Sequence, residues 1–449
     1  MPHVEFVPLS GFRVREEELL GLGMTLPGLG ARGRAIGELP ALGVLALAGM
    51  LPPAWTAGYR AAERVDDELV DGIVARRPDV VAISCLTASA LEAYTLAGRL
   101  RAHRVPTVIG GLHATALPDE AGRHCDAVVV GDGEAVWPRL IADLERGDLR
   151  PRYDAGAAFP LAAAPVPRYD LLGSGPRPRF TLQTQRGCPL ACEFCAASRL
   201  LGPHREKPAE RIAAELDALC AGHPRPNVEL ADDNSFVSPG RAAVIADLFA
   251  GRGIRWFTES DWRIGERPAE LRRLAAAGLV QVLVGIESLP FRHPGMGAKR
   301  VEMGRILDAV AAIQEAGIVV NGCFIVGADG ETDATLDHLV EFLLAAPFAE
   351  VQVTLETPFP GTALHARLAR AGRLIADRDW SHYTLFDVVH HPTALSVAGL
   401  EAGFRRVLGA VFGPGPSAAR ARRRRRVWAD HPAFRGRPPA APGLPECPA

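Results

Sequence analysis

The chain has 449 residues, of which 48% are apolar and 23% charged, and its formal net charge is -2. This is enough to bury well-formed cores in two or three domains, and the balanced charge gives no reason to expect a nucleic acid as partner. The first residues carry no basic region ahead of an apolar one, and the longest apolar stretch, residues 39–55, is short and broken by glycine and proline. The sequence therefore predicts a cytoplasmic protein without a signal peptide or membrane span.

Residues 3 to about 145 alternate short apolar runs with helix-like segments. The predicted strands cover 4–9, 59–65, 79–84, 106–109 and 127–130, and the predicted helices cover 41–51, 66–76, 90–104 and 135–146. Asp66 or Asp67 is expected to cap the second helix. Because strands separated by such helices need right-handed crossovers, we expect a parallel sheet covered on both faces. The sequence predicts a five-stranded doubly wound, Rossmann-like domain over residues 1–147.

Residues 148–178 are rich in proline, alanine and glycine, which predicts a linker. A second alternating series occupies residues 179–363. Its predicted strands are 179–183, 228–231, 254–258, 280–285, 319–326 and 350–355. Six such units are too few for the usual eight-fold barrel, so we expect an open (βα)6 partial barrel with its active site at the carboxyl ends of the strands. The fold class is α/β.

The pattern loosens from about residue 364. Residues 364–430 are expected to form a mainly helical C-terminal region, and residues 431–449, rich in proline and glycine, a disordered tail. The arginine run 422–426 could bind a polyanion, but a solvated face or a disordered tail is the commoner meaning of such a run. We assign it no function.

Three of the eight cysteines, Cys188, Cys192 and Cys195, fall within eight residues. They directly follow the first predicted barrel strand and therefore lie at the catalytic rim. Three closely spaced thiolates can bind three irons of a [4Fe–4S] cluster and leave the fourth iron open to a chelating substrate. A structural zinc site that adds a histidine such as His204 is the alternative, but zinc sites usually pair two C-x2-C knuckles, and the sequence has no second knuckle.

The motif C-x3-C-x2-C, with Phe194 before its last cysteine, resembles that of the radical S-adenosylmethionine (SAM) superfamily. The resemblance implies that SAM chelates the open iron and that an electron from the cluster cleaves SAM to a 5′-deoxyadenosyl radical. This radical abstracts a hydrogen from the substrate. The resemblance also implies a small-molecule or natural-product substrate and an electron donor such as flavodoxin or ferredoxin.

Further SAM contacts are implied at the ends of the second and third barrel strands. Asp232 would face the SAM amino group, with a helix cap made by Asp233 or Asn234 as the alternative. Glu259 and Arg263 would face the sulfonium and the carboxylate, and a surface ion pair is the alternative for them.

The fourth and fifth strand ends complete this set. Glu287 would accept hydrogen bonds from the ribose hydroxyls, with a role in helix entry as the alternative. Ile325 and Gly327 resemble the family's adenine-side segment, and Phe194 is counted among the SAM contacts.

Five candidate contact residues mark the strand ends of the N-terminal domain, where doubly wound folds bind their ligands. They are Ser84 and Leu86 after the third strand, Gly110 and Gly111 after the fourth, and Gly131 after the fifth. Glycines there permit the close approach of a bulky group. The arrangement resembles cobalamin-binding domains, in which S-x-L and G-G elements surround the nucleotide tail. Together with the barrel it is similar to the B12-binding-domain radical SAM subfamily.

One departure from the cobalamin-binding pattern stands out. The D-x-H-x-x-G motif that ligates cobalt from below is absent, and the corresponding loop reads Ser10–Gly11–Phe12–Arg13. We therefore expect no protein histidine under the cobalt. His113 and Glu134 are more simply explained as structural residues, Glu134 by capping the next helix.

The resemblance implies a cobalamin-dependent radical SAM methyltransferase that acts on an unactivated carbon. Two alternatives stay open. The first is a non-methylating radical SAM cyclase or rearrangement enzyme, with or without cobalamin. The second is a zinc-stabilised binding protein without radical chemistry.

Overall fold

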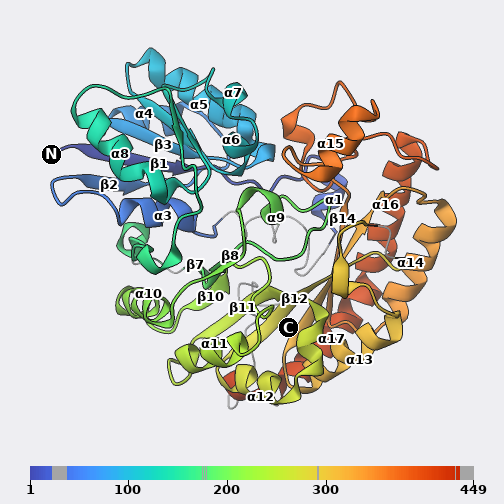
Figure 1. Cartoon of the computed structure of the whole chain (residues 1–449). Helices are drawn as coiled ribbons and strands as arrows, with labels where there is room; N and C mark the ends of the chain where they lie inside the picture. Colours follow the sequence, from blue (N-terminus) through green and yellow to red (C-terminus); the bar gives the residue numbers. More distant parts are fainter. Residues whose placement is uncertain are drawn as a thin grey trace.

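The computed structural model describes residues 1–22, 38–173, 175, 177, 179–290, 293–429 and 431–434. They form two parallel β-sheets covered by helices, followed by a helical C-terminal region (Figure 1). The N-terminal sheet lies above the larger, curved one in this view, and the helices α10 to α14 surround the latter. Within the described ranges, no helix is long and apolar enough to cross a membrane.

The N-terminal sheet has six parallel strands in the order β2-β1-β3-β4-β5-β6. They are β1 (His3–Pro8), β2 (Thr56–Tyr59), β3 (Val80–Ser84), β4 (Thr107–Gly110), β5 (Ala127–Val130) and β6 (Arg152–Asp154). The expectation of five strands was therefore one short, because β6 lies in the segment predicted as a linker. Three residues around Tyr153, whose ring is buried and whose hydroxyl donates to Asp143 at 2.9 Å, are too few to show a strand pattern.

Helices cover both faces of this sheet, as expected for a doubly wound domain. Helices α3 (Leu42–Ala48) and α8 (Gly133–Glu145) bury one face, and α4 (Asp67–Val74) and α5 (Ala90–Ala102) bury the other. Asp66 caps α4 by accepting a hydrogen bond from the Leu69 amide at 2.9 Å. The second strand was predicted at 59–65 but lies at Thr56–Tyr59, and beyond it only Ala62 makes an isolated bridge, to Leu9.

The second sheet runs β7-β10-β11-β12-β13-β14, all parallel, with β7 and β14 at its two ends. Its strands are β7 (Phe180–Leu182), β10 (Asn227–Leu230), β11 (Arg255–Ser260), β12 (Leu279–Glu287), β13 (Val319–Val326) and β14 (Glu350–Leu355). The helices on its outer face are α10 (Ala209–Gly222), α11 (Arg241–Phe249), α12 (Pro268–Ala276), α13 (Met303–Glu315) and α14 (Asp333–Ala345). This is the predicted six-stranded partial barrel, open between β7 and β14.

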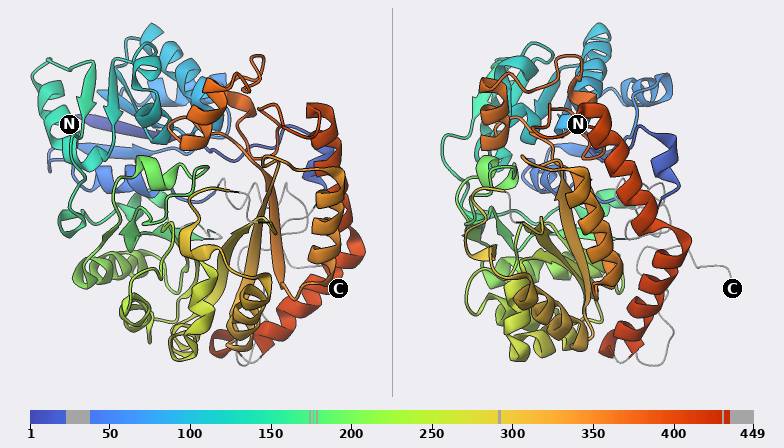
Figure 2. Two further views of the ribbon diagram at one scale, coloured as in Figure 1. Left: turned by 45° about the vertical axis from the view of Figure 1, so that its right-hand side comes forward. Right: turned by 90° about the vertical axis from the view of Figure 1, so that its right-hand side faces the viewer.

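The C-terminal region is helical, as expected, with α15 (Ala363–Arg370), α16 (Val397–Phe412) and α17 (Pro414–Ala429). Figure 2 shows α16 and α17 running along the β14 side of the barrel. The arginine run lies within α17 and is partly structural: Arg423 donates to the carbonyls of Ala346 and Phe348, and Arg424 pairs with Glu350. These contacts lie at the amino ends of the strands, away from the catalytic rim.

The prediction of a disordered tail begins too early. His431 and Phe434 are buried, and the His431 ring nitrogen Nε2 lies 2.9 Å from the carbonyl oxygen of Leu279. Trp428 donates to the Val280 carbonyl at 2.8 Å and packs against Phe434. Residues 431–434 therefore close the amino end of the barrel, and the rest of the predicted tail, 435–449, lies outside the described residues.

Candidate active site at the strand ends

The three cysteines lie on the loop 187–195, which we call the cluster loop. It follows the two-residue strand β8 (Gln185–Arg186), which pairs with β9 (Arg205–Glu206), and precedes α9 (Ala197–Leu200). Gly187 starts the loop at φ +78°, and a Cβ there would lie 2.9 Å from the Gly202 carbonyl oxygen. This position therefore requires glycine.

Neighbouring segments hold the cluster loop from two sides. A Cβ on Gly295 would lie 1.9 Å from the Ala191 carbonyl oxygen, so the segment after β12 packs directly on the loop. On the other side, Glu193 accepts a hydrogen bond from Arg367 of α15 at 2.8 Å. The loop is thus held in place by residues far from it in sequence.

The surroundings of the three cysteines favour thiolates that are bound to metal over bare thiolates. Cys192 is buried, Cys188 and Cys195 are half-buried, and none of the three is in a disulfide. Burial raises the pKa of Cys188 and raises that of Cys192 to about 11, while Lys299 opposes the shift at Cys192. Bare thiolates are therefore disfavoured here, and bound iron would supply the missing positive charge. We infer that these three residues hold the [4Fe–4S] cluster.

The zinc alternative gains no support from the site. His204 is half-buried, and its Nε2 atom has no hydrogen-bond partner. In the described part of the chain, no three His, Cys, Asp or Glu side chains, the three cysteines included, converge on the position of a single metal ion. A [4Fe–4S] cluster does not need this convergence, because each thiolate binds a different iron.

Glu287 lies at the end of β12, where a register shift interrupts the pairing with β13. Its backbone φ is +71°, a strained value for a residue other than glycine, which costs on the order of 1–3 kcal/mol and is common at functional sites. Its carboxylate accepts from Lys299 at 2.8 Å. Burial disfavours the charge of Lys299, but Glu287 raises the pKa of this lysine overall. With Ile325, Glu287 lines a cavity of about 260 Å³, which agrees with the proposed roles of these two residues in binding SAM.

If Glu287 binds the ribose, Glu287→Gln should weaken SAM binding to the cluster-loaded protein by roughly 1–3 kcal/mol, or about 5- to 150-fold. The cluster absorbance should survive, and SAM affinity can be measured by equilibrium dialysis. The double variant Glu287→Gln/Lys299→Met controls for the lysine left without its partner. Recovery of wild-type affinity in the double variant, or no loss in the single one, would assign Glu287 a structural role.

Asp232 is better explained as a structural residue than as a partner of the SAM amino group. It is fully buried, and its carboxylate accepts from the Thr184 amide and hydroxyl, the Gln185 amide and the Ser235 hydroxyl, at 2.5 to 3.1 Å. These bonds tie the segment after β7 to the end of β10, which favours a structural role, and the expected contact of Asp232 with the SAM amino group stays a prediction. The neighbouring Asp233 accepts from the Gly187 amide at 3.0 Å, and burial together with Asp232 raises its pKa to about 6.

Arg263 is held by Asp261, with two hydrogen bonds of 2.8 and 2.7 Å from its guanidinium. Burial would raise the pKa of Asp261, but the hydrogen bonds from Arg263 and Asn234 lower it overall. Arg263 therefore forms an ion pair with the buried Asp261, and its expected contact with the SAM carboxylate stays a prediction. Glu259 is half-buried near the end of β11, where its carbonyl oxygen accepts from the Ser235 amide at 2.9 Å.

Gly327 has a conformational role in the structure. Its φ is +100°, its amide donates to Glu331 at 3.2 Å, and its carbonyl lies 3.2 Å from His390 Nε2. Both backbone polar groups of Gly327 have partners within the protein, and its expected contact with adenine stays a prediction. Phe194 is half-buried and meets His293 edge-on, with ring centroids 5.0 Å apart.

Sequence reasoning missed several residues of this rim. Lys299, Gly295, His293 and Arg367 come from loops and a helix that carry no motif of their own. They reach the cluster loop only through the fold, so no local pattern could have identified them.

A cavity of about 540 Å³, which we call the strand-end cavity, opens between the two sheets. It is lined by all five residues proposed to contact cobalamin: Ser84, Leu86, Gly110, Gly111 and Gly131. On the barrel side it is lined by Gln183, Arg186 and Leu200. Volumes of about 300–1,000 Å³ are typical of cofactor sites, and this one could take a nucleotide-sized group.

The glycines of this cavity differ in their constraints. A Cβ on Gly111, where φ is +107°, would lie 2.5 Å from the Cys85 carbonyl oxygen, so Gly111 serves the packing of two strand ends. A Cβ on Gly110 would meet only Val129, at 3.6 Å. A side chain could therefore be added at position 110 without a backbone clash.

No histidine, cysteine or methionine is among the described residues that line the strand-end cavity. His113 is buried elsewhere, with Nε2 3.1 Å from the Tyr94 hydroxyl, which agrees with a structural role. Glu134 was expected to cap α8. Its carboxylate instead accepts a hydrogen bond from Arg186 of β8, the strand that precedes the cluster loop.

The strand ends of the doubly wound domain share a cavity with the cysteine-bearing rim of the partial barrel. This arrangement defines a two-domain radical SAM enzyme. Residues 29–141 match the family model described as B12 binding domain, and residues 182–343 match that of the Radical SAM superfamily. The chain belongs to the radical SAM enzymes that carry a B12-binding domain, and the two domains imply a [4Fe–4S] cluster, SAM and cobalamin as cofactors.

The chain is similar to several known proteins. It is 25% identical, over 74% of its length and 75% of the relative's, to bacteriochlorophyllide d C-12(1)-methyltransferase of Chlorobaculum tepidum. It is 24% identical, over 78% of its length and 65% of the relative's, to the anaerobic magnesium-protoporphyrin IX monomethyl ester cyclase of Cereibacter sphaeroides. Its fold is similar to that of the radical SAM methyltransferase TsrM from Kitasatospora setae, with a TM-score of 0.66, 15% identity and coverage of 95% of this chain and 99% of TsrM.

Proposed function

We propose that this enzyme is a cobalamin-dependent radical SAM methyltransferase that methylates an unactivated carbon of a small molecule. The observation that carries the proposal is the shared cavity: Gly110 and Gly131 of the N-terminal domain and Arg186 of the barrel line the same space. Arg186 precedes Cys188 by two residues. A cobalamin in the strand-end cavity would therefore lie beside the loop that carries the cluster.

When bound, the cluster and SAM supply a 5′-deoxyadenosyl radical, and cobalamin supplies the methyl group. The protein's own residues position these groups and keep them apart from water. Cys188, Cys192 and Cys195 hold the cluster, and Glu287 holds the SAM ribose. Lys299 orients the Glu287 carboxylate through the 2.8 Å hydrogen bond between them.

The N-terminal domain offers cobalamin no side chain suited to a strong lower ligand, because the described lining of the strand-end cavity holds no histidine. Gly110, Gly131 and Arg186 would line the space that holds cobalamin, and the bound cofactor would supply the methyl group. Leu86 is 46% exposed and lines the cavity, which places an apolar side chain where a flat ring system could rest.

The proposal includes a small electron-transfer protein, a flavodoxin or ferredoxin, as the source of electrons in the cytoplasm. The similarity to a cyclase keeps a non-methylating radical reaction as the second candidate. Product analysis separates the two.

The test uses anaerobic protein loaded with cluster and cobalamin, reduced with dithionite and given SAM with a deuterated methyl group. A methyltransferase should form both S-adenosylhomocysteine and 5′-deoxyadenosine, because it uses SAM in two ways. Formation of 5′-deoxyadenosine without S-adenosylhomocysteine in cobalamin-loaded protein would favour the cyclase class.

A further inference from the structure

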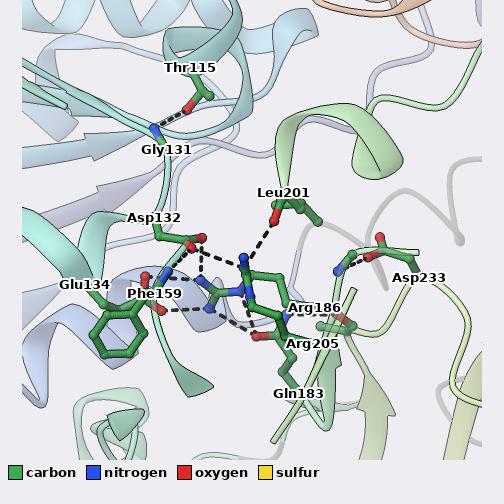
Figure 3. Close-up of polar contacts among 12 residues, drawn as sticks. Thr115, Gly131, Asp132, Glu134, Phe159, Gln183, Arg186, Leu201, Arg205 and Asp233 are labelled. Atoms are coloured by element: carbon green, nitrogen blue, oxygen red, sulfur yellow. Dashed lines mark hydrogen bonds and ion pairs between the residues drawn. The ribbon is translucent and has the colours of Figure 1, made fainter. Parts of the chain in front are cut away.

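Four charged side chains join the two domains at the strand-end cavity (Figure 3). Asp132 directly precedes α8 and Glu134 lies in its first turn, and Arg186 and Arg205 come from β8 and β9, the two-stranded sheet after the first barrel strand. We call these four residues the junction ion cluster. Asp132, Glu134 and Arg186 also line the strand-end cavity.

Arg186 binds both carboxylates at once. Its guanidinium donates to Asp132 at 2.7 Å and to Glu134 at 2.7 Å. The side chain of Arg186 is 13% exposed, that of Asp132 9% and that of Glu134 7%. Burial alone would lower the pKa of Arg186, but the two carboxylates raise it overall. Charge-assisted hydrogen bonds with so little water nearby are strong and geometrically specific.

Asp132 joins three segments of the chain. One carboxylate oxygen accepts from Arg186, and the other accepts from Arg205 at 3.1 Å and from the Phe159 amide at 2.7 Å. Phe159 lies in the connection between the domains, and Figure 3 shows the three donors around one carboxylate. Removal of the Asp132 carboxylate would therefore loosen the contact of β8 and β9 with the N-terminal domain.

The local geometry shows that these side chains make contacts between the two domains instead of contacts within their own helix or strand pair. Asp132 occupies the N-cap position of α8, where an aspartate usually accepts from the first turn, but its side chain makes no capping hydrogen bond. Arg186 and Arg205 stand opposite each other in the β8–β9 pair. Like charges at such positions repel, and here Asp132 lies between them and offsets the repulsion.

The junction ion cluster adjoins both proposed cofactor sites. Gly131 and Gly133, on either side of Asp132, line the strand-end cavity. Gly187 and Cys188 directly follow Arg186 in the sequence. The half-buried side chain of Arg186 therefore belongs to the cavity wall, and its backbone leads directly into the cluster loop.

We propose that the junction ion cluster couples the two cofactor sites, so that ordering the cluster loop with iron and sulfide strengthens cobalamin binding, with Arg186 as the positioning residue. This inference rests on the proposed function. Coupling of binding free energies is reciprocal, so cobalamin should protect the iron–sulfur cluster from chelators to the same degree.

The test measures the dissociation constant of hydroxocobalamin, by anaerobic equilibrium dialysis, for full-length protein with and without the reconstituted cluster. Wild type should bind hydroxocobalamin at least about five-fold more tightly with the cluster, the lower end of typical couplings. In Arg186→Gln the ratio should fall to about one, although the variant still binds both cofactors. Asp132→Asn, a smaller perturbation, serves as a second variant should Arg186→Gln fold poorly, and it should also lower the ratio.

Arg179→Gln is the matched control. The Arg179–Glu229 pair has a comparable length, 2.8 Å, and is somewhat more exposed, but it links the start of β7 to β10 and does not line the strand-end cavity. This variant should keep the wild-type ratio. A ratio of one in wild type, or an unchanged ratio in both Arg186→Gln and Asp132→Asn, would overturn the coupling while leaving the proposed function intact. Failure of wild type to bind hydroxocobalamin in either state would overturn both.

Discussion

Cys192→Ala is expected to abolish the iron–sulfur cluster and, with it, SAM cleavage. The cluster loop, residues 187–195, holds no fourth cysteine that could replace Cys192. A cluster left with two thiolates should be lost on desalting. The anaerobically reconstituted variant should show no charge-transfer absorbance and no 5′-deoxyadenosine above the background of protein-free controls.

Cys220→Ala is the control for this experiment. Cys220 is half-buried on α10, on the outer face of the barrel, and is likewise a free thiol. The control should keep the full absorbance and activity. If Cys192→Ala retained a cluster with wild-type SAM cleavage, the assignment of the cluster ligands would be wrong.

Gly110→Val is expected to remove cobalamin binding while the barrel keeps its cluster. The substitution causes no backbone clash, since a Cβ there meets only Val129 at 3.6 Å, but it adds a branched side chain at the wall of the strand-end cavity. Loss of a fitted contact surface of this kind should weaken hydroxocobalamin binding by at least about ten-fold, in line with the 1–3 kcal/mol typical of overpacking.

Gly98→Val is the matched control for this variant. Gly98 is exposed on α5, and a Cβ there would meet nothing within 4 Å. The control should bind hydroxocobalamin like wild type. Equal affinity in Gly110→Val and wild type would show that cobalamin does not occupy this cavity, and a change of iron content in Gly110→Val would show a wider structural effect.

The sequence allowed most of the architecture and the cysteine motif to be predicted, because both depend on local patterns. Alternating apolar runs identify parallel strands, and parallel strands place their carboxyl ends at one edge. This is why Ser84, Gly110 and Gly131, far apart in the chain, could be expected to share a site. The motif around Cys188, Cys192 and Cys195 is contained in a single loop.

Other features depend on tertiary contacts, which a local pattern does not record. A carboxylate at a strand end can face the catalytic rim or accept hydrogen bonds from a neighbouring strand end. Asp232 accepts such bonds from Thr184. Glu134 was expected to cap α8, yet its carboxylate accepts from Arg186 of the other domain. Lys299 was missed because only the fold brings it to Glu287. The three residues of β6 were too few to distinguish from a linker.

The central claim is that one chain carries an iron–sulfur cluster and cobalamin together. The most direct test is to count iron, sulfide and cobalamin in wild-type protein after anaerobic reconstitution and removal of unbound cofactors. We expect about four irons, four sulfides and one cobalamin per chain. Stoichiometric zinc without iron, or a full cluster with no retained cobalamin, would contradict the claim.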